Sequence, residues 1–515
     1  MTIRLLRRVD VAVRHHLTLA DLADRLAAMH GDRLMATEVH GDPGSSRVGS
    51  FTFARAAEHV AKWSAAIAAR SDAGRPVVVA TDNGIEQFLL CLAVSRAGGL
   101  PAPVNPQMSS AEVHHVIQDS GASLVIRDPS ELASGPGSRS RLDQPAMPDP
   151  DDVAALFYTS GTTGAPKGAE LTHRALVGNL ASAAVWPAWL RHDEIVLSLP
   201  VAHIMGFVAL LAPALAGVAV YFMPRFSAEA VLDAIEERRA SAFMGVPATS
   251  RLRLGAGAEE RDLRSIRLWM TGADVMPADL ARRFKSFGAS ACLPLIGPVG
   301  EAAFFEGYGM VEVGGGVAAK VSPPMLPMGL GDSLGFRLPG WRFRVTDADG
   351  EPVRSGSVGE LEVKGPGVLR GYWGDPGATK AALTEDGWLR TGDLVRAGPM
   401  GMVVFQGRAK NVIKSGGYSV YAVEVEADLE EHPDVVEAAV VGLPHPRLGE
   451  VPAAAVRIRG GSRLTPSELV VWARQRMARY KAPRQVVFVD DLPRTGTRKV
   501  QRDKLRPLFP DSQAS

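Results

Sequence analysis

The chain has 515 residues, too many for one hydrophobic core, so we expect about three or four packing units. Hydrophobic residues make up 46% of the sequence and the formal net charge is only +1, which excludes a general attraction to nucleic acid or to an anionic membrane surface. The cysteines, Cys91 and Cys292, are too few for a disulfide framework or a four-ligand zinc site, and we expect a cytoplasmic protein.

Helical and strand-like segments alternate over the first 160 residues. Helical apolar spacing predicts helices, and short apolar runs predict strands, in the order 19–29 (helix), 52–70 (helix), 76–80 (strand), 85–97 (helix), 123–127 (strand) and 153–158 (strand). Such alternation indicates α/β architecture with mostly parallel, covered sheets. Residues 128–151 are rich in Pro, Ser, Gly and Asp, so we expect a linker or surface loop there.

A loop with the composition of a phosphate-binding site follows the strand at 153–158. Its sequence is YTSGTTGAPKG, at residues 158–168, and a helical stretch is predicted from about 174. Glycines allow backbone N–H groups to approach a ligand, hydroxyls add further donors, and a lysine adds a positive charge. The residues that we expect to contact phosphate are Thr159, Ser160, Gly161, Thr162, Thr163, Gly164 and Lys167. The spacing differs from that of a P-loop.

This loop resembles the signature loop of the adenylate-forming superfamily, which includes acyl-CoA synthetases, adenylation domains of peptide synthetases and luciferases. Similar motifs recur in order over about residues 100–506. The resemblance implies a large adenylation domain of several subdomains with mostly parallel sheets, and a small mobile C-terminal α+β domain. It also implies the use of ATP and Mg²⁺.

The segment LPVAHIMGF at 199–207 resembles the family segment whose histidine lies near the acyl pocket, so His203 is a candidate catalytic or gating residue. A histidine between apolar neighbours is also a common core residue, and this alternative stays open. The uncharged stretch 204–223 is long enough to span a membrane. Pro213 and Gly217 interrupt it, so we predict a buried helix followed by a strand and no stable membrane insertion.

Two later motifs resemble the family's adenine-binding segments. In MTGADVMP, at 270–277, Gly272 and Ala273 would lie beside the purine. In GYGMVE, at 307–312, the resemblance places Tyr308 on the adenine, with the neighbouring nucleotide-binding positions Gly309 and Met310. It also makes Glu312 a catalytic residue and the Mg²⁺ ligand, and a carboxylate oxygen suits Mg²⁺. Val311 stands where the family usually has threonine, so a hydroxyl near the phosphates is missing.

Residues just before the C-terminal domain and at its start complete the implied site. Asp393, in WLRTGD, would accept hydrogen bonds from both ribose hydroxyls. Arg408 would reach ribose or phosphate, and Lys410 falls at the family's hinge position. Gly416 and Gly417 would let the arm of coenzyme A pass along the backbone.

The C-terminal segments predict a small α+β domain. Its expected elements are strands near 436–441, 452–457 and 486–490 and a helix at 466–479. We therefore predict domains 1–406 and 407–515. LPRTGTRKVQRDKLR, at 492–506, resembles the catalytic lysine loop, in which Lys499 would meet the transferring phosphoryl group; a solvated basic tail is the alternative.

These motifs predict an AMP-forming acid–thiol ligase. The tract 313–317 after Glu312 contains three consecutive glycines, and side chains of minimal size leave room for a chain. We expect a medium- or long-chain fatty acid and transfer to coenzyme A. The alternatives are an aryl acid, an acyl-AMP ligase that donates to an acyl carrier protein, and a nucleotide-binding protein without catalysis.

Overall fold

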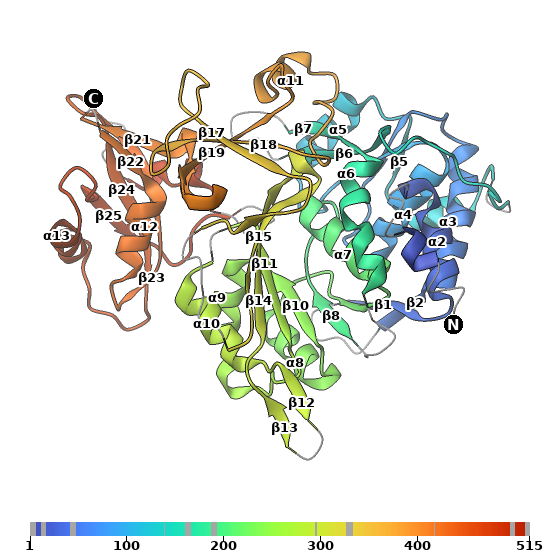
Figure 1. Ribbon diagram of the computed structural model, residues 1–515, viewed down its shortest axis with the longest axis horizontal. Helices are drawn as coiled ribbons and strands as arrows, with labels where there is room; N and C mark the ends of the chain where they lie inside the picture. Colours follow the sequence, from blue (N-terminus) through green and yellow to red (C-terminus); the bar gives the residue numbers. More distant parts are fainter. Residues whose placement is uncertain are drawn as a thin grey trace. The chain divides into compact units, whose positions relative to one another are not determined.

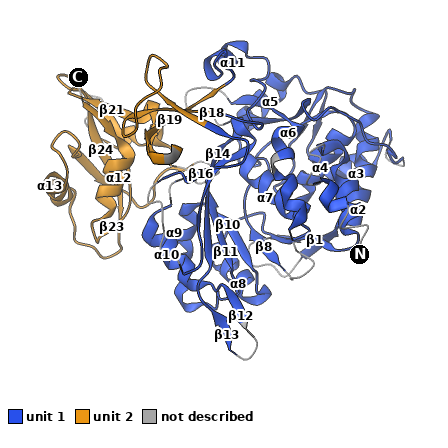
Figure 2. Cartoon of the chain, in the orientation of Figure 1, with its two compact units in different colours: residues 1–342, 364–387 blue, residues 343–363, 388–515 orange. Residues whose placement is uncertain are grey.

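The structure, a computed structural model, describes residues 7–11, 17–41, 48–137, 140–159, 166–186, 193–274, 276–293, 296–325, 333–416, 418–494 and 500–509. The chain divides into two compact units (Figure 2). Residues 1–342 and 364–387 form the first, and residues 343–363 and 388–515 form the second. Both units mix helices with strands, so the predicted α/β class is confirmed.

A parallel sheet in the order β4-β3-β5 lies near the start of the first unit. Its elements and their neighbours are α2 (Leu19–His30), α3 (Phe53–Ala68), β3 (Pro76–Val79), α4 (Ile85–Arg96), β4 (Leu100–Pro103), α5 (Ser110–Ser120) and β5 (Leu124–Ile126). The helices start where the sequence provides capping hydroxyls: Thr52 accepts a hydrogen bond from the backbone of α3, and Ser109 from that of α5. The helices and strands predicted here are confirmed.

A large sheet forms the centre of the first unit, in the order β16-β15-β14-β11-β10-β8-β9-β1-β2 (Figure 1). From β14 to β1 the neighbours are parallel, and β2, β15 and β16 join antiparallel. The strands are β1 (Leu34–Val39), β2 (Val48–Thr52), β8 (Glu194–Leu197), β9 (Ala219–Phe222), β10 (Ala242–Gly245), β11 (Leu268–Gly272), β14 (Ala303–Met310), β15 (Gly315–Ser322) and β16 (Phe336–Arg337). The prediction of mostly parallel sheets is therefore correct.

A hydrophobic core joins this sheet to the helices beside it. The helices are α8 (Ala228–Arg238), α9 (Pro247–Gly255) and α10 (Ala278–Phe287). Phe243, Trp269 and Phe284 are buried in this core, and the Trp269 ring contacts the rings of both phenylalanines. A separate antiparallel hairpin, β12 (Ala291–Leu293) and β13 (Gly297–Val299), follows α10. The core fixes the strands that lead to the site residues 272–273 and 308–312.

The long apolar stretch 204–223 is a helix and a strand, as predicted. α7 (Ile204–Ala216) ends at Gly217, whose φ of 71° is left-handed, and β9 enters the large sheet. Glycine takes that backbone conformation without the steric cost that a side chain adds. Among the residues that the structure describes, no helix is long and apolar enough to cross a membrane.

The predicted phosphate loop lies between two antiparallel strands. β6 (Val153–Thr159) precedes it and β7 (Lys167–Thr172) follows, with Thr159 opposite Lys167. The short helix α6 (His173–Leu176) begins close to the predicted position and continues into a 3₁₀ helix, Gly178–Val185. The sequence prediction passed directly from the loop to the helix and missed β7.

The second unit contains two sheets. One has the order β17-β18-β19-β20, and the other has the order β22-β21-β24-β23 with β25 beside β24. The elements are β17 (Arg342–Thr346), β18 (Val358–Lys364), β19 (Leu389–Ala397), β20 (Val403–Arg408), β21 (Val412–Ser415), β22 (Tyr418–Tyr421), α12 (Ala422–Glu430), β23 (Val435–His445), β24 (Gly449–Ile458), α13 (Pro466–Arg476) and β25 (Gln485–Phe488). The α+β segments predicted after residue 407 are all found.

The predicted domain boundary between residues 406 and 407 stays a prediction, because it marks the place where the C-terminal domain is expected to turn about a hinge. The compact units divide earlier in the chain, since β17 to β20 group with the C-terminal segments. Lys410, the predicted hinge residue, lies in the short 3₁₀ helix η6 (Ala409–Asn411), between the two sheets in sequence.

Candidate functional site

Lys167 starts β7 and lies at the end of the predicted phosphate loop. Its Nζ lies 3.1 Å from Asp375 Oδ2 and 5.7 Å from the centre of the Tyr372 ring. Its side chain is about half exposed, so it stays accessible to an anionic ligand. The other predicted loop residues, Ser160, Gly161, Thr162, Thr163 and Gly164, lie outside the described residues.

Glu312 lies in the short 3₁₀ helix η4 (Val311–Val313), directly after β14. Its Oε1 accepts a hydrogen bond of 3.0 Å from the Tyr372 hydroxyl, and its carbonyl oxygen accepts one of 2.8 Å from the backbone of Leu369. Burial and the adjacent Glu312 carboxylate raise the pKa of Tyr372 above its usual range, so the phenol stays protonated and keeps donating. The loop around residue 370 therefore fixes both the backbone and the carboxylate of Glu312.

Tyr372 and Asp375 are site residues that the sequence analysis missed. They lie in the segment 359–379, which reads as structural. The structure brings this segment to both Glu312 and Lys167, so Tyr372 lies between the predicted metal ligand and the predicted phosphate-binding cation. In the sequence, these residues are only a tyrosine and an aspartate among glycines. That pattern alone does not reveal that Tyr372 contacts Glu312, which lies 60 residues earlier in the chain.

The carboxylate of Glu312 fits the Mg²⁺ role. Within the described part of the chain, no three His, Cys, Asp or Glu side chains come together as a metal cage. Mg²⁺ that is held by one or two carboxylates and by substrate phosphates needs no such cage. Oε2 of Glu312 receives no hydrogen bond from the described residues, while Oε1 is oriented by Tyr372. When bound, the ion would neutralise phosphate charge.

The predicted adenine-side residues lie on two adjacent parallel strands. β11 ends at Gly272 opposite Gly307 of β14, and a Cβ atom at Gly272 would lie 3.0 Å from the Gly307 carbonyl oxygen. Ala273 has a φ of 70°, which is uncommon for a residue with a side chain and concentrates at functional sites. Tyr308 is half buried on the next strand. The structure thus brings the two predicted adenine segments together.

The positions around Glu312 have structural reasons of their own. A Cβ atom at Gly309 would lie 1.7 Å from the Gly315 carbonyl oxygen, so only glycine fits where β14 and β15 pair. Met310 caps η4, and Val311 is buried. A buried apolar side chain therefore stands at position 311, where the family usually has a threonine hydroxyl.

His203 caps the N-terminus of α7. Its Nδ1 accepts a hydrogen bond of 3.2 Å from the backbone N–H of Met205. An accepting Nδ1 places the ring proton of neutral imidazole on Nε2. The structure supports the helix-capping role directly, and the gating role near the acyl pocket stays a prediction.

In the second unit, Asp393 and Arg408 are partners on adjacent strands. They face each other across β19 and β20, with 2.7 Å between Arg408 Nε and Asp393 Oδ1. Asp393 is 1% exposed, and Arg408 also donates a hydrogen bond of 3.0 Å to the Thr391 carbonyl oxygen. A buried carboxylate needs such a charged partner, and the guanidinium of Arg408 provides it. Contact of both residues with ribose stays a prediction.

The hinge and thiol-channel candidates are also in the second unit. Burial, followed by the charge of Arg408, lowers the pKa of Lys410. Gly416 has a φ of 58°, and a Cβ atom there would lie 3.0 Å from Leu448 Cδ2. Gly417 and Lys499 lie outside the described residues.

Comparison with known proteins matches two family descriptions to this chain. The description "AMP-binding enzyme" matches residues 24–373, and "AMP-binding enzyme C-terminal domain" matches residues 424–499. The chain belongs to the AMP-binding enzyme family. The predicted adenylate-forming superfamily is therefore confirmed.

Family members of known activity cover most of the chain. It is 35% identical to a feruloyl-CoA synthase of Amycolatopsis over 81% of this chain and 85% of that protein. It is 34% identical to an indoleacetate–CoA ligase of Aromatoleum aromaticum (83% and 86%), and 29% to the long-chain-fatty-acid–CoA ligase FadD13 of Mycobacterium tuberculosis (85% and 88%).

Solved family structures share the fold. ATP-bound MatB from Rhodopseudomonas palustris has a TM-score of 0.82 at 29% identity, covering 96% of this chain and 99% of that chain. The o-succinylbenzoate CoA synthetase of Bacillus subtilis, in complex with ATP and magnesium ion, has a TM-score of 0.76 at 26% identity, covering 94% and 99%. The predicted architecture of the AMP-binding family is thus confirmed.

Proposed function

We propose that this chain is an AMP-forming acid–CoA ligase. The observation that carries the proposal is the set formed by Glu312, Tyr372 and Lys167 at the end of β14 and the start of β7. In this proposal the carboxylate of Glu312 holds Mg²⁺, the phenol of Tyr372 orients that carboxylate, and Lys167 binds phosphate. Family membership supports the same activity and confirms ATP, Mg²⁺ and coenzyme A as the cosubstrates and cofactor.

Both substrates of the first half-reaction are anions that repel each other. The site must hold them together and neutralise charge at the α-phosphorus. A carboxylate oxygen attacks the α-phosphorus, the bond to the bridging oxygen breaks, and pyrophosphate leaves. Lys167 and the loop before it bind the phosphates, Glu312 holds Mg²⁺, and Lys499 stabilises the charge of the transition state.

The second half-reaction consumes the acyl-adenylate. The sulfur of coenzyme A attacks the acyl carbon, its proton passes to solvent, and AMP leaves. The family resemblance assigns this step to the segment with Gly416, after a turn of the C-terminal domain about Lys410. Closure that completes two successive sites is an established way to separate half-reactions.

The acid is a hydrophobic carboxylic acid in this proposal. The fatty acid of the sequence prediction has support from FadD13, at 29% identity, whereas the aryl alternative has support from the feruloyl and indoleacetate ligases, at 35% and 34%. The glycine tract adds little to the fatty acid argument. Gly314 and Gly315 have φ values of 65° and 128°, so the turn from β14 to β15 itself requires glycine. We therefore favour an aryl acid.

A screen of mixed fatty and aryl acids with ATP, Mg²⁺ and coenzyme A, read by mass spectrometry, tests this proposal. The expected products are AMP and the CoA thioester of an aryl acid. A fatty acyl-CoA instead would restore the first substrate prediction. Transfer to an acyl carrier protein but not to coenzyme A would establish the carrier-protein alternative, and the absence of any adenylate would overturn the enzyme assignment.

A further inference from the structure

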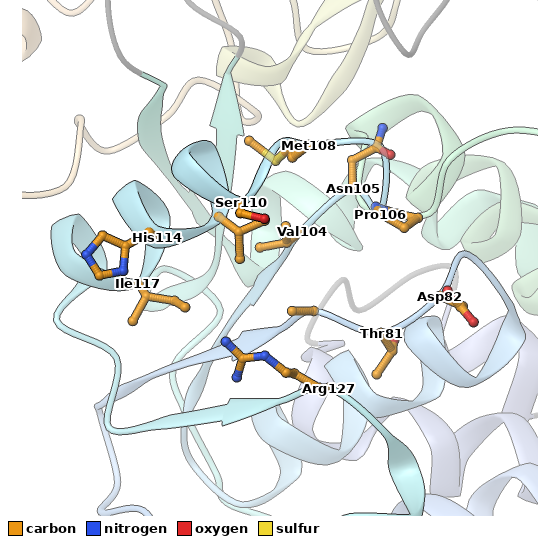
Figure 3. A pocket seen from close by; sticks show the side chains of 12 residues that line it. Thr81, Asp82, Val104, Asn105, Pro106, Met108, Ser110, His114, Ile117 and Arg127 are labelled. Carbon is orange, nitrogen blue, oxygen red and sulfur yellow. The ribbon is translucent and has the colours of Figure 1, made fainter.

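A cavity of about 470 Å³ opens at the carboxyl ends of the parallel strands β3, β4 and β5 (Figure 3). Residues that follow each strand line it, including Thr81, Asn105 and Arg127, and one face of α5 forms the remaining wall. β4 and β5 pair with opposite sides of β3. In open α/β sheets, ligands bind beyond the carboxyl ends of the strands where the chain leaves in opposite directions.

Several polar groups around this cavity have no protein partner. Within the described residues, the side chains of Asp82, His114 and Arg127 make no hydrogen bond or ion pair, and all three are exposed. Thr81 is 5% exposed, and its hydroxyl has no hydrogen-bond partner among the described residues. A buried hydroxyl without a partner destabilises the folded protein, and a bound acceptor would offset that cost after rotation about the Cα–Cβ bond.

The lining determines which ligands fit. Arg127 offers a planar guanidinium that binds a carboxylate through two parallel hydrogen bonds. Asp82 adds one negative charge, which disfavours polyanions such as nucleoside triphosphates. Val104, Met108 and Ile117 provide an apolar wall for the rest of a small molecule. We propose that this cavity binds a small organic monocarboxylate with an apolar body and is an effector site apart from the ATP site.

α5 connects the cavity to the phosphate hairpin. Ile117 and His114 face the cavity, while two other residues of α5 bond to the strands that flank residues 160–165. Asp119 accepts a hydrogen bond of 2.8 Å from the Tyr158 hydroxyl in β6, and His115 Nε2 lies 2.8 Å from the carbonyl oxygen of Pro166, just before β7. A ligand that contacts α5 therefore touches a helix that is bonded on both sides of residues 160–165, and we expect its binding to be coupled reciprocally to ATP binding.

Fluorine NMR of the full chain with 4-fluorobenzoate tests the site, with neutral 4-fluorobenzamide as the matched ligand. We expect the carboxylate to bind and Arg127→Ala to weaken that binding at least tenfold. Arg141→Ala, at another exposed arginine, should leave it unchanged. Binding that is equal in Arg127→Ala and the unmodified chain, or equal for the amide, would place the probe elsewhere and overturn the proposal. Because this test needs no turnover, its failure leaves the ligase activity untouched.

Thr81→Val separates binding from folding. Valine has nearly the same shape and removes the unpartnered hydroxyl, so the unfolding midpoint of the free protein should rise while affinity for 4-fluorobenzoate falls. A lower midpoint together with unchanged affinity would show that the hydroxyl serves the fold and not a ligand.

The coupling between the cavity and the ATP site is measured with α,β-methylene-ATP, a nucleotide that cannot release pyrophosphate. Saturating 4-fluorobenzoate should tighten its binding three- to tenfold, and Arg127→Ala should abolish the effect. Equal nucleotide affinity with and without the probe would overturn the effector role. Competition with the acid that the enzyme activates then identifies the effector. If this acid displaces 4-fluorobenzoate from the site that depends on Arg127, the cavity binds the substrate acid itself. If it does not displace the probe, the effector is a different acid.

Discussion

At the scale of single residues, the account depends on how Tyr372 holds the Glu312 carboxylate. Tyr372→Phe keeps the ring near Lys167 and removes only the hydrogen bond to Oε1. Hydrogen bonds to charged groups contribute about 1.5–3 kcal/mol, so pyrophosphate exchange should fall about tenfold or more. The Mg²⁺ concentration for half-maximal rate should rise as well, since the metal ligand is no longer oriented.

Glu312→Gln should lose most of the adenylation activity while the protein stays folded, because the variant removes the charge that holds Mg²⁺. Pyrophosphate exchange over a series of Mg²⁺ concentrations measures both variants. An unchanged Mg²⁺ dependence in Tyr372→Phe would show that the phenol does not position the metal ligand.

Glu38 gives the fold a pH dependence. Its side chain is 8% exposed, and burial, with a smaller contribution from the charge of Glu86, raises its pKa to about 7. Between pH 4.5 and 7 the unfolded chain binds fewer protons at this residue than the folded chain does, so stability falls as pH rises. The loss is on the order of 3 kcal/mol at most.

Glu38→Gln should remove this loss. The amide oxygen still accepts the hydrogen bond from the backbone of Ile85, 2.6 Å long in the unmodified protein, without a charge to bury. The unfolding midpoint of the variant should therefore exceed that of the unmodified chain at pH 8 and approach it at pH 5. Glu86→Gln, at an exposed position, is the matched control and should shift the midpoint only slightly. A difference independent of pH would contradict the assigned cause.

At the scale of elements, α7 and the start of β15 form one surface. A Cβ atom at Gly315 would lie 3.4 Å from Val208 Cγ2 of α7, the helix that His203 caps. If this surface borders the acyl pocket, Val208→Ala should shift preference toward bulkier acids by roughly 10-fold, the scale of one or two methylene groups in a pocket. Competition between acids of graded size, read as kcat/KM ratios, measures the shift.

Val208 is a better test position than Gly315. A leucine at Gly315 would strain a backbone whose φ is 128° and would confuse folding with specificity. Val208 is in a regular helix, so its truncation leaves the backbone unchanged. An unaltered acid profile in folded Val208→Ala would show that α7 does not line the pocket.

The same elements show what the sequence could predict. The apolar run that Pro213 and Gly217 interrupt predicted α7 and β9, and the glycine and hydroxyl pattern predicted the loop between β6 and β7. β7 was missed because KGAELT has little β-branched or aromatic character and forms a strand through its pairing with β6. Gly314 and Gly315 were interpreted as open space, because a sequence does not reveal φ. Tyr372 was missed because its partner is 60 residues away.

At the scale of the whole molecule, the proposal assigns two half-reactions to different residues. In this proposal Lys499 acts while the phosphoryl group transfers, and Gly416 acts when the thiol arrives. Gly416→Ala should slow thioester formation and spare pyrophosphate exchange. Because Gly416 has a φ of 58°, circular dichroism must first show that the variant is folded. Slowed exchange with normal thioester formation would contradict the role of Gly416.

The most direct test of the central claim compares both half-reactions in Lys499→Ala. Adenylate formation should slow roughly 10²- to 10³-fold, the scale of losing one preorganised donor, while preformed acyl-adenylate and coenzyme A should yield thioester at close to the normal rate. Lys504→Ala, in the same basic segment, should change neither rate. Equal loss of both half-reactions in folded Lys499→Ala would contradict the two-step acid–CoA ligase proposed for this chain.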